Sequence, residues 1–136
     1  MTEAAIPFPF AHTGVFDIGT HAPGAPTLQA VLSTPANSST VSGHGTLTQA
    51  TNPPLNINNA FHGVVHALGL GPAVQIYALQ GAAIPPLLGA PHVTNLVITL
   101  QGVWGDKGTA TYTYVTGAVF HEVRDVPVAV RWLLQA

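Results

Sequence analysis

The sequence predicts an all-β protein: an antiparallel sandwich or barrel of about eight or nine strands, in a single domain over residues 1–136. Two observations support this fold class. Val, Ile, Thr and Tyr dominate the regular segments, whereas the strong helix formers Glu, Lys, Arg and Met are almost absent. Turn segments rich in Gly, Pro and Asn also interrupt the chain at short intervals, which is typical of sandwiches and barrels.

Nine strands are expected, each bounded by turn residues. They cover residues 14–18, 27–33, 40–51, 61–68, 73–80, 93–102, 108–116, 118–123 and 126–134. The clearest hairpin joins residues 96–102 to residues 108–115, because Asp106 and Gly108 supply the turn chemistry and Lys107 can sit in water. A second tight connection is expected at Gly117.

Residues 109–115 alternate plainly, so their side chains divide between two faces of a strand. One face carries Thr109, Thr111 and Thr113, and the other carries Ala110, Tyr112 and Tyr114. The threonine face is interpreted as a solvated outer face, with contact to another protein as the alternative. The buried faces are expected to include Val15, Leu28, Val31, Leu47, Ile76, Leu96, Ile98, Tyr112, Tyr114, Val128 and Trp132.

Charge is the most unusual property of the composition. Residues 18–105 contain no Asp, Glu, Lys or Arg, and the only cations of the chain are Lys107, Arg124 and Arg131. Three scattered cations are too few to neutralise several phosphates, so the sequence predicts no binding to nucleic acid. The chain has no cysteine, which excludes disulfides and thiolate chemistry, and the sequence predicts no cofactor.

The first ten residues, MTEAAIPFPF, lack the cationic start and unbroken apolar core of a secretory signal. No apolar run is long enough for a transmembrane helix. A cytoplasmic location is therefore expected by default, and release by a route without a signal peptide stays open.

The seven histidines are the most numerous chemically active side chains. His62 and His66 are the candidates for a metal site, because a helix would bring residues four apart together. Gly63, Val64 and Val65 favour a strand instead, in which the two rings share a face but lie about 13 Å apart. The sequence therefore favours two ordinary histidines over a metal site.

No other pattern supports an enzyme. Ser42 and His44 share a face of the predicted strand, but the sequence indicates no third member of a catalytic triad. Glu122 and Arg124 share a face and are interpreted as a surface ion pair, whereas His121 is expected on the opposite face. Asp17 is expected to face solvent on an edge strand.

Two segments resemble a small bacterial family that is defined only as a domain of unknown function. They are VSGHGTLTQATNPPLN at residues 41–56 and GTATYTYVTGAVFHEVRDVPV at residues 108–128. The similarity lies in the TQATNPPL string and in the spaced Tyr–Tyr, HEV and PV residues. The resemblance implies a β-rich fold and a bacterial source, and it brings no known activity or catalytic residue.

The sequence predicts a non-enzymatic structural protein that associates with itself into a homo-oligomer or a larger array. Like molecules with so little charge barely repel one another, and edge strands would lack the lysines that normally block pairing. The apolar loop IPPLLGAP at residues 84–91 offers Leu87 and Leu88 as contacts, together with the three threonines. The alternative is a barrel that binds a small apolar ligand, with Tyr77, Trp104 or the histidines giving polar orientation.

Overall fold

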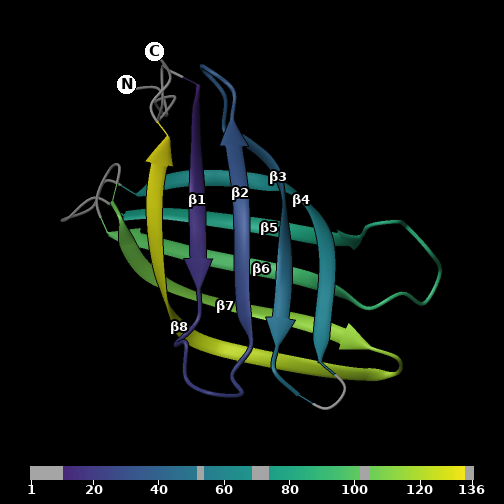
Figure 1. Ribbon diagram of the computed structural model, residues 1–136. Coiled ribbons are helices and arrows are strands. Elements are labelled where there is room, and N and C mark those ends of the chain that lie inside the picture. The colour runs from purple at the N-terminus through teal and green to yellow at the C-terminus, as the bar shows by residue number, and fades with distance from the viewer. Residues whose placement is uncertain (1–10, 52–53, 69–73, 102–104, 134–136) are drawn as a thin grey trace.

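The computed structural model describes residues 11–51, 54–68, 74–101 and 105–133, and these residues form eight antiparallel strands that close into a barrel (Figure 1). The strands are β1 (His12–Ile18), β2 (Thr27–Thr34), β3 (Thr40–Gln49), β4 (Leu55–Leu68), β5 (Val74–Ala83), β6 (His92–Gln101), β7 (Lys107–Thr116) and β8 (Val119–Leu133). The all-β prediction is confirmed, and of its two forms the barrel is the one observed. No helix that could span a membrane occurs among these residues.

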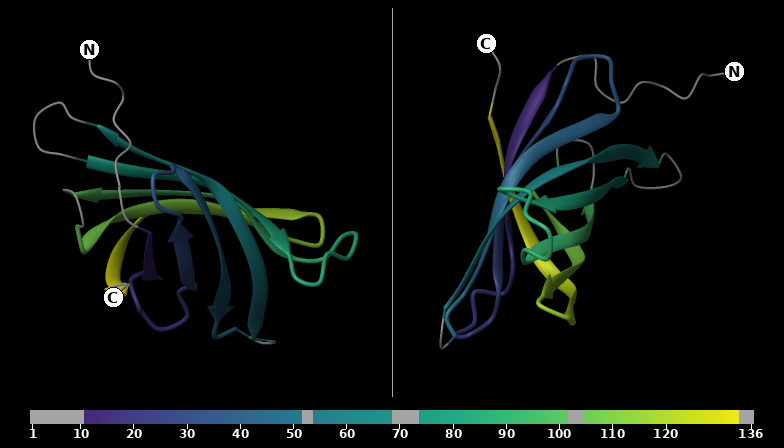
Figure 2. Two further views of the ribbon diagram at one scale, coloured as in Figure 1. Left: turned by 90° about the horizontal axis from the view of Figure 1, so that it is seen from above. Right: turned by 90° about the vertical axis from the view of Figure 1, so that its right-hand side faces the viewer.

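The barrel is flattened into two layers whose strands cross one another (Figures 1 and 2). The two longest strands, β4 and β8, pass from one layer to the other. The first part of β4 pairs with β3 and its last part with β5. Likewise, β8 pairs first with β7 and then with β1, which closes the ring. The first and last strands of the barrel therefore lie side by side.

The predicted strands at 118–123 and 126–134 are in fact one strand, which is why the barrel has eight strands and not nine. A β-bulge joins the two parts: Tyr112 pairs with Val123 and Ala110 pairs with Val126, so two residues of β8 oppose Thr111. Asp125 adopts a left-handed conformation there, with a φ of 50°, and its amide donates to the Thr111 hydroxyl over 3.1 Å. The polar HEVRD segment therefore bends the strand without ending it.

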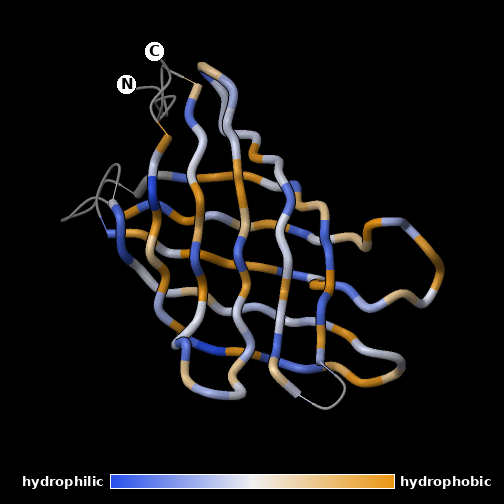
Figure 3. Tube along the Cα trace, viewed as in Figure 1, coloured by the Kyte–Doolittle hydropathy of each residue, from blue (hydrophilic) through white to orange (hydrophobic). Residues whose placement is uncertain are grey.

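Alternate side chains of all eight strands form the core of the barrel, and Figure 3 shows hydrophobic and hydrophilic residues alternating along the strands. The prediction of buried positions is confirmed for Leu28, Leu47, Leu96, Ile98, Tyr112, Tyr114 and Val128. It is wrong for Val15, Val31 and Ile76, which alternate with buried residues and point outward, while Trp132 is only partly buried against the core. Both faces of these strands carry apolar residues, so hydrophobicity alone did not fix which face is inside.

Neighbouring strands approach one another very closely at four glycines. A Cβ atom placed on Gly43, Gly63, Gly81 or Gly108 would lie only 1.9 to 2.1 Å from a carbonyl oxygen of the adjacent strand. No real Cβ atom tolerates such a contact, so each position requires the absence of a side chain. These glycines permit the flattened, sharply curved shape of the barrel.

Regular pairing between β5 and β6 stops short of one end of both strands, and Asn59 of β4 supplies a hydrogen bond there. Pairing between β5 and β6 reaches only as far as Gln80 and Asn95, although β5 continues to Ala83. The Val93 amide donates instead to the Asn59 side-chain oxygen over 2.7 Å, and the Asn59 nitrogen donates to the Ile57 carbonyl over 3.3 Å. Asn59 is fully buried, so its amide supplies the partner that the backbone would otherwise lack.

Candidate functional site

Three side chains inside the barrel bring polar atoms into the core without a protein hydrogen-bond partner. They are Gln75 and Tyr77 on β5 and Tyr112 on β7. Both amide atoms of Gln75 and both phenol oxygens are buried, and no described residue forms a hydrogen bond with any of the four. Native proteins pair nearly all such groups, so this set marks the barrel interior as a candidate binding site.

An aromatic chain runs from these residues toward the end of the barrel that holds the β1 start and the β8 end. Tyr77 packs edge-on against Phe16 with ring centres 5.4 Å apart, and Phe16 packs edge-on against Trp132 at 5.7 Å. Trp132 in turn lies 5.5 Å from the ring of His12. Trp132 is partly exposed and donates to the Gly105 carbonyl over 3.1 Å, so the chain connects the buried phenol with the protein surface.

Burial raises the pKa of the Tyr77 phenol well above its ordinary value, because the charged phenolate would lose its hydration. Burial also raises the pKa of Tyr112, and the neighbouring Tyr114 adds to this effect. Both phenols are therefore neutral hydrogen-bonding groups at any physiological pH. They can donate to or accept from a ligand, but they cannot act as bases.

We expect the barrel to lose stability in alkali because of these two tyrosines. In the unfolded chain they ionise near pH 10, whereas in the barrel they remain protonated above that pH. The folded state then binds more protons, so the free energy of unfolding falls by about 1.4 kcal/mol per pH unit for each tyrosine above pH ~10. Denaturant unfolding at a series of pH values should show this loss, and Tyr77→Phe should remove the part that Tyr77 contributes. An alkaline loss that is unchanged in Tyr77→Phe would contradict the assignment.

A second feature is an apolar surface formed by two adjacent loops, the β5–β6 loop and the β7–β8 hairpin. We call the exposed residues Ile84, Leu87, Leu88, Val119 and Phe120 the apolar end. Leu88 is fully exposed and Phe120 is 75% exposed. The two loops are neighbours because His92, at the start of β6, pairs with Val115, and Val115 pairs with Phe120. Figure 3 shows both loops as largely hydrophobic segments at the right of the barrel.

The β5–β6 loop arches over an open pocket of about 420 Å³ beyond the last regularly paired residues of β5 and β6. The loop is an ordered turn: the Leu87 amide donates to Pro85 over 2.8 Å and the Ala90 amide donates to Leu87 over 3.1 Å. His92 lies at its base, with its Nδ1 atom 2.9 Å from the Ala90 carbonyl. Leu87 and Leu88 are thus held outward by a defined turn instead of packing into the core.

The predicted division of β7 into two faces is confirmed. Ala110, Tyr112 and Tyr114 are buried, while Thr109, Thr111 and Thr113 lie on the outer face. Two of the three threonines already have partners within the chain, since Thr113 bonds Thr94 and Thr111 accepts from Asp125. Of the three, Thr109 is the most exposed, so it is the strongest candidate for contact with another molecule.

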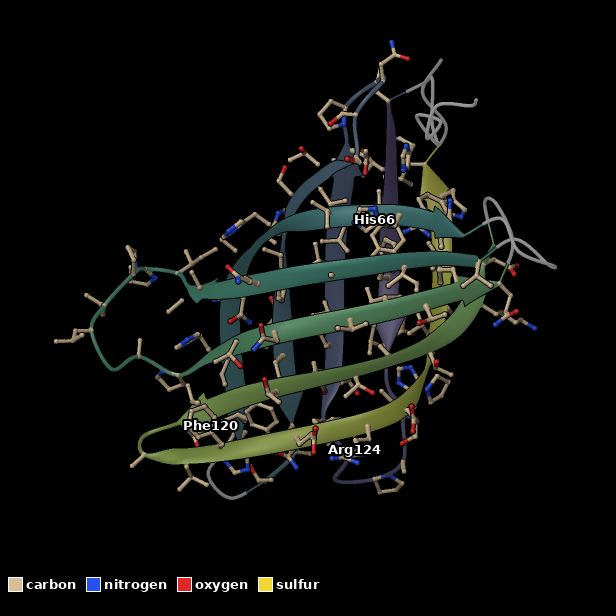
Figure 4. The ribbon with its side chains drawn as sticks, turned by 180° about the vertical axis from the view of Figure 1, so that it is seen from behind. His66, Phe120 and Arg124 are labelled. Carbon is tan, nitrogen blue, oxygen red and sulfur yellow. The ribbon has the colours of Figure 1, made fainter. Side chains whose placement is uncertain are left out.

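His62 and His66 both lie in strand β4 with exposed side chains on the same face, as the strand interpretation predicts. Figure 4 shows His66 on the outer surface of the layer, far from Phe120 and Arg124 on β8. Within residues 11–51, 54–68, 74–101 and 105–133, no group of three His, Cys, Asp or Glu side chains is placed to hold a metal ion. Because His62 and His66 lie in a strand, the helical arrangement that would unite the two rings does not occur.

The structure pairs Asp17 with His21, a contact that sequence reasoning missed. The His21 Nε2 atom lies 3.0 Å from the Asp17 carboxylate across the end of β1. The expected edge position of Asp17 is wrong, because β1 pairs with both β2 and β8. His21 also lines an open pocket of about 570 Å³ between the β1–β2 and β3–β4 loops. Both partners are substantially exposed, so the pair contributes little to stability.

The remaining sequence candidates are surface residues. Ser42 and His44 both lie exposed on β3. The Arg124 guanidinium donates to the Glu122 carboxylate over 2.8 Å on the outer face, which confirms the predicted ion pair. His121 points to the opposite face, where its ring stacks on Tyr114 at 4.6 Å and its Nε2 atom lies 2.8 Å from the Thr116 hydroxyl. Trp104 falls outside the described residues.

The comparison with protein families matches residues 11–120 to the family described as Domain of unknown function (DUF1842). The chain belongs to this family. The matched region spans β1 to β7 and ends just after β8 begins, so it includes Gln75, Tyr77, Tyr112 and the whole apolar end. The expected membership in a β-rich family of unknown function is confirmed. A search of curated proteins found no match to the chain.

In this member of the DUF1842 family, sequence reasoning missed Gln75 as a site residue. The segment VQIYALQ carries apolar residues on both faces, and the prediction placed Ile76 inside. Gln75 shares a face with Tyr77 and Leu79. The side chains of Tyr77 and Leu79 are bulky, as expected for a buried face. The sequence signal for this site was therefore a polar residue, Gln75, two positions before an aromatic residue, Tyr77, on the same face of the strand.

Proposed function

We propose that this protein is a non-enzymatic building block that associates with further copies of itself through the apolar end. The single observation that supports this function most strongly is the group of five exposed large hydrophobic side chains on two adjacent loops. Soluble monomers rarely gather such residues in one place, because exposed apolar area costs about 25 cal/mol per Å² relative to burial.

The charge distribution also supports contact between identical copies. The β5–β6 loop and the β7–β8 turn contain no charged residue, and the nearest charges, Glu122 and Arg124, neutralise one another. Two copies brought together at this surface therefore meet without like-charge repulsion. A two-fold contact suits this arrangement, since each copy would offer the same surface to the other.

One expectation from the sequence that favoured self-association is wrong. The expected unprotected edge strands do not exist as such, because the barrel closes and every described strand has a neighbour on each side. Only the last residues of β5 and the first residues of β6 extend beyond their mutual pairing, and they lie beside the β5–β6 loop. The contact is therefore proposed to rest on side chains of the apolar end and not on edge-to-edge strand pairing.

Light scattering coupled to size-exclusion chromatography tests this function. The native chain should elute with a mass that is a multiple of one chain, and Leu88→Asp should shift it toward the monomer. Each copy would lose a buried leucine and gain a desolvated charge, so we expect dissociation to become roughly a hundredfold easier. Phe120→Asp should act in the same direction.

Ala36→Asp is the matched control, because Ala36 is exposed in the β2–β3 turn at the opposite end of the barrel. It adds the same charge and should leave the mass unchanged. A native chain that is monomeric at high concentration, or a Leu88→Asp variant that keeps the native mass, would overturn the proposal. Circular dichroism of each variant verifies that the barrel is intact.

A further inference from the structure

We propose that the barrel interior binds one small neutral molecule with a hydroxyl or carbonyl group, held by Gln75, Tyr77 and Tyr112. This site is separate from the apolar end and does not depend on self-association. The proposal rests on the four polar atoms of these side chains that are buried and lack a hydrogen-bond partner among the described residues.

These unpaired atoms destabilise the empty barrel, because each buried donor or acceptor without a partner has lost its hydration and gained no hydrogen bond. Gln75 is 0% exposed and contributes both a donor and an acceptor, and the two phenols are 1% exposed. A leucine or phenylalanine would fill the same volume at no such cost. A polar ligand that pairs with these groups removes the penalty and gives the polar residues a role.

The positions of the three residues define one region of the interior. Gln75 and Tyr77 lie two residues apart on β5 and face the same way. Tyr77 pairs across the sheet with Ile98, and Ile98 pairs with Ala110, two residues before Tyr112. Gln75 pairs with Leu100 and Tyr112 pairs with Leu96, so Tyr77 lies between the other two along β6 and is the central residue of the proposed site.

The chemistry of the lining specifies the class of ligand. Every Asp, Glu, Lys and Arg among the described residues lies on the outer surface or in a turn, so nothing charged faces the interior. An anionic or cationic ligand would be desolvated there without a counter-charge, at high cost. Phe16, Ile98 and Leu100 are fully buried around Gln75 and Tyr77, so the ligand body is apolar or aromatic. Large side chains fill most of the barrel, which requires the ligand to be small.

Phenol is a suitable probe, with benzene as the comparison that lacks the hydroxyl. Calorimetric titration of the native chain should show phenol binding at least about tenfold tighter than benzene, since one hydrogen bond to these groups is worth about 1.4 kcal/mol. Gln75→Leu should weaken phenol binding about tenfold and raise the unfolding midpoint of the ligand-free protein. Native mass spectrometry of the purified chain should also detect a small co-purified molecule.

Gln80→Leu is the matched control, because Gln80 lies on the same strand but is exposed on the outer face. It should bind phenol like the native chain. If Gln75→Leu does not fold, Tyr77→Phe provides the same test with a smaller change. A native chain that does not bind phenol, or that binds it no better than Gln75→Leu or Tyr77→Phe does, would overturn the proposal.

Discussion

Gly63→Ala is expected to destabilise the barrel by about 3 kcal/mol or more, and the variant is expected to lose most of its folded population. The new Cβ atom would lie 2.0 Å from the Ala78 carbonyl oxygen and 2.8 Å from the Leu79 Cα atom. Both contacts involve backbone of the neighbouring strand, so no side-chain rotation relieves them. Urea unfolding followed by circular dichroism measures the change.

The control for Gly63→Ala is Gly89→Ala in the β5–β6 loop. Gly89 has a φ of 78°, and a Cβ atom there meets nothing within 4 Å. This variant measures the strain of a left-handed alanine without a steric clash, which should cost about 1 to 2 kcal/mol. Equal losses in the two variants would show that β4 and β5 can move apart, contrary to the close contact.

Replacing Asn59 by Ala is expected to cost about 3 kcal/mol. The substitution removes the acceptor of the Val93 amide, leaves that buried amide unpaired, and opens a cavity where the side chain was. Val93 follows His92 at the base of the β5–β6 loop, so the same change should loosen the base of this loop. Hydrogen exchange at the Val93 amide reports this loosening directly.

Asn58→Ala provides the comparison one residue away. Asn58 points outward and accepts from the exposed Thr46 hydroxyl over 2.9 Å, so its loss should cost under about 1 kcal/mol. If the two asparagine variants unfolded at the same denaturant concentration, the buried hydrogen bond of Asn59 would contribute no more to stability than the exposed hydrogen bond of Asn58.

Much of the fold follows from local patterns. The alternation in residues 109–115 placed the tyrosines inside and the threonines outside, and the turn residues located most strand ends. The start of β4 was harder, because its asparagines resemble a turn. Residues 55–60 are extended because they pair with β3. Asn59 can be buried because its side-chain oxygen accepts a hydrogen bond from the Val93 amide of β6. Tertiary partners decided these positions.

The candidate sites were harder to predict from the sequence. Leu87 and Leu88 stood out because prolines and a glycine bar them from a regular strand, and they are indeed exposed. Gln75 did not, since its segment is apolar on both faces and only the closed barrel decides which face is inside. The contact between His21 and Asp17 depends on the left-handed conformation of His21, with a φ of 61°, which no residue pattern indicates.

The pairing of β1 with β8 has a consequence for biosynthesis. Gly14 pairs with Trp132, 118 residues later in the sequence, so this pairing can form only after β8 has been synthesised. Until then β1 and β7 each present an unpaired row of backbone amides and carbonyls, the situation in which nascent sheets aggregate. Barrel closure is therefore a late, non-local event, so folding should be slow for a chain of this size and should depend on translation having reached the last strand.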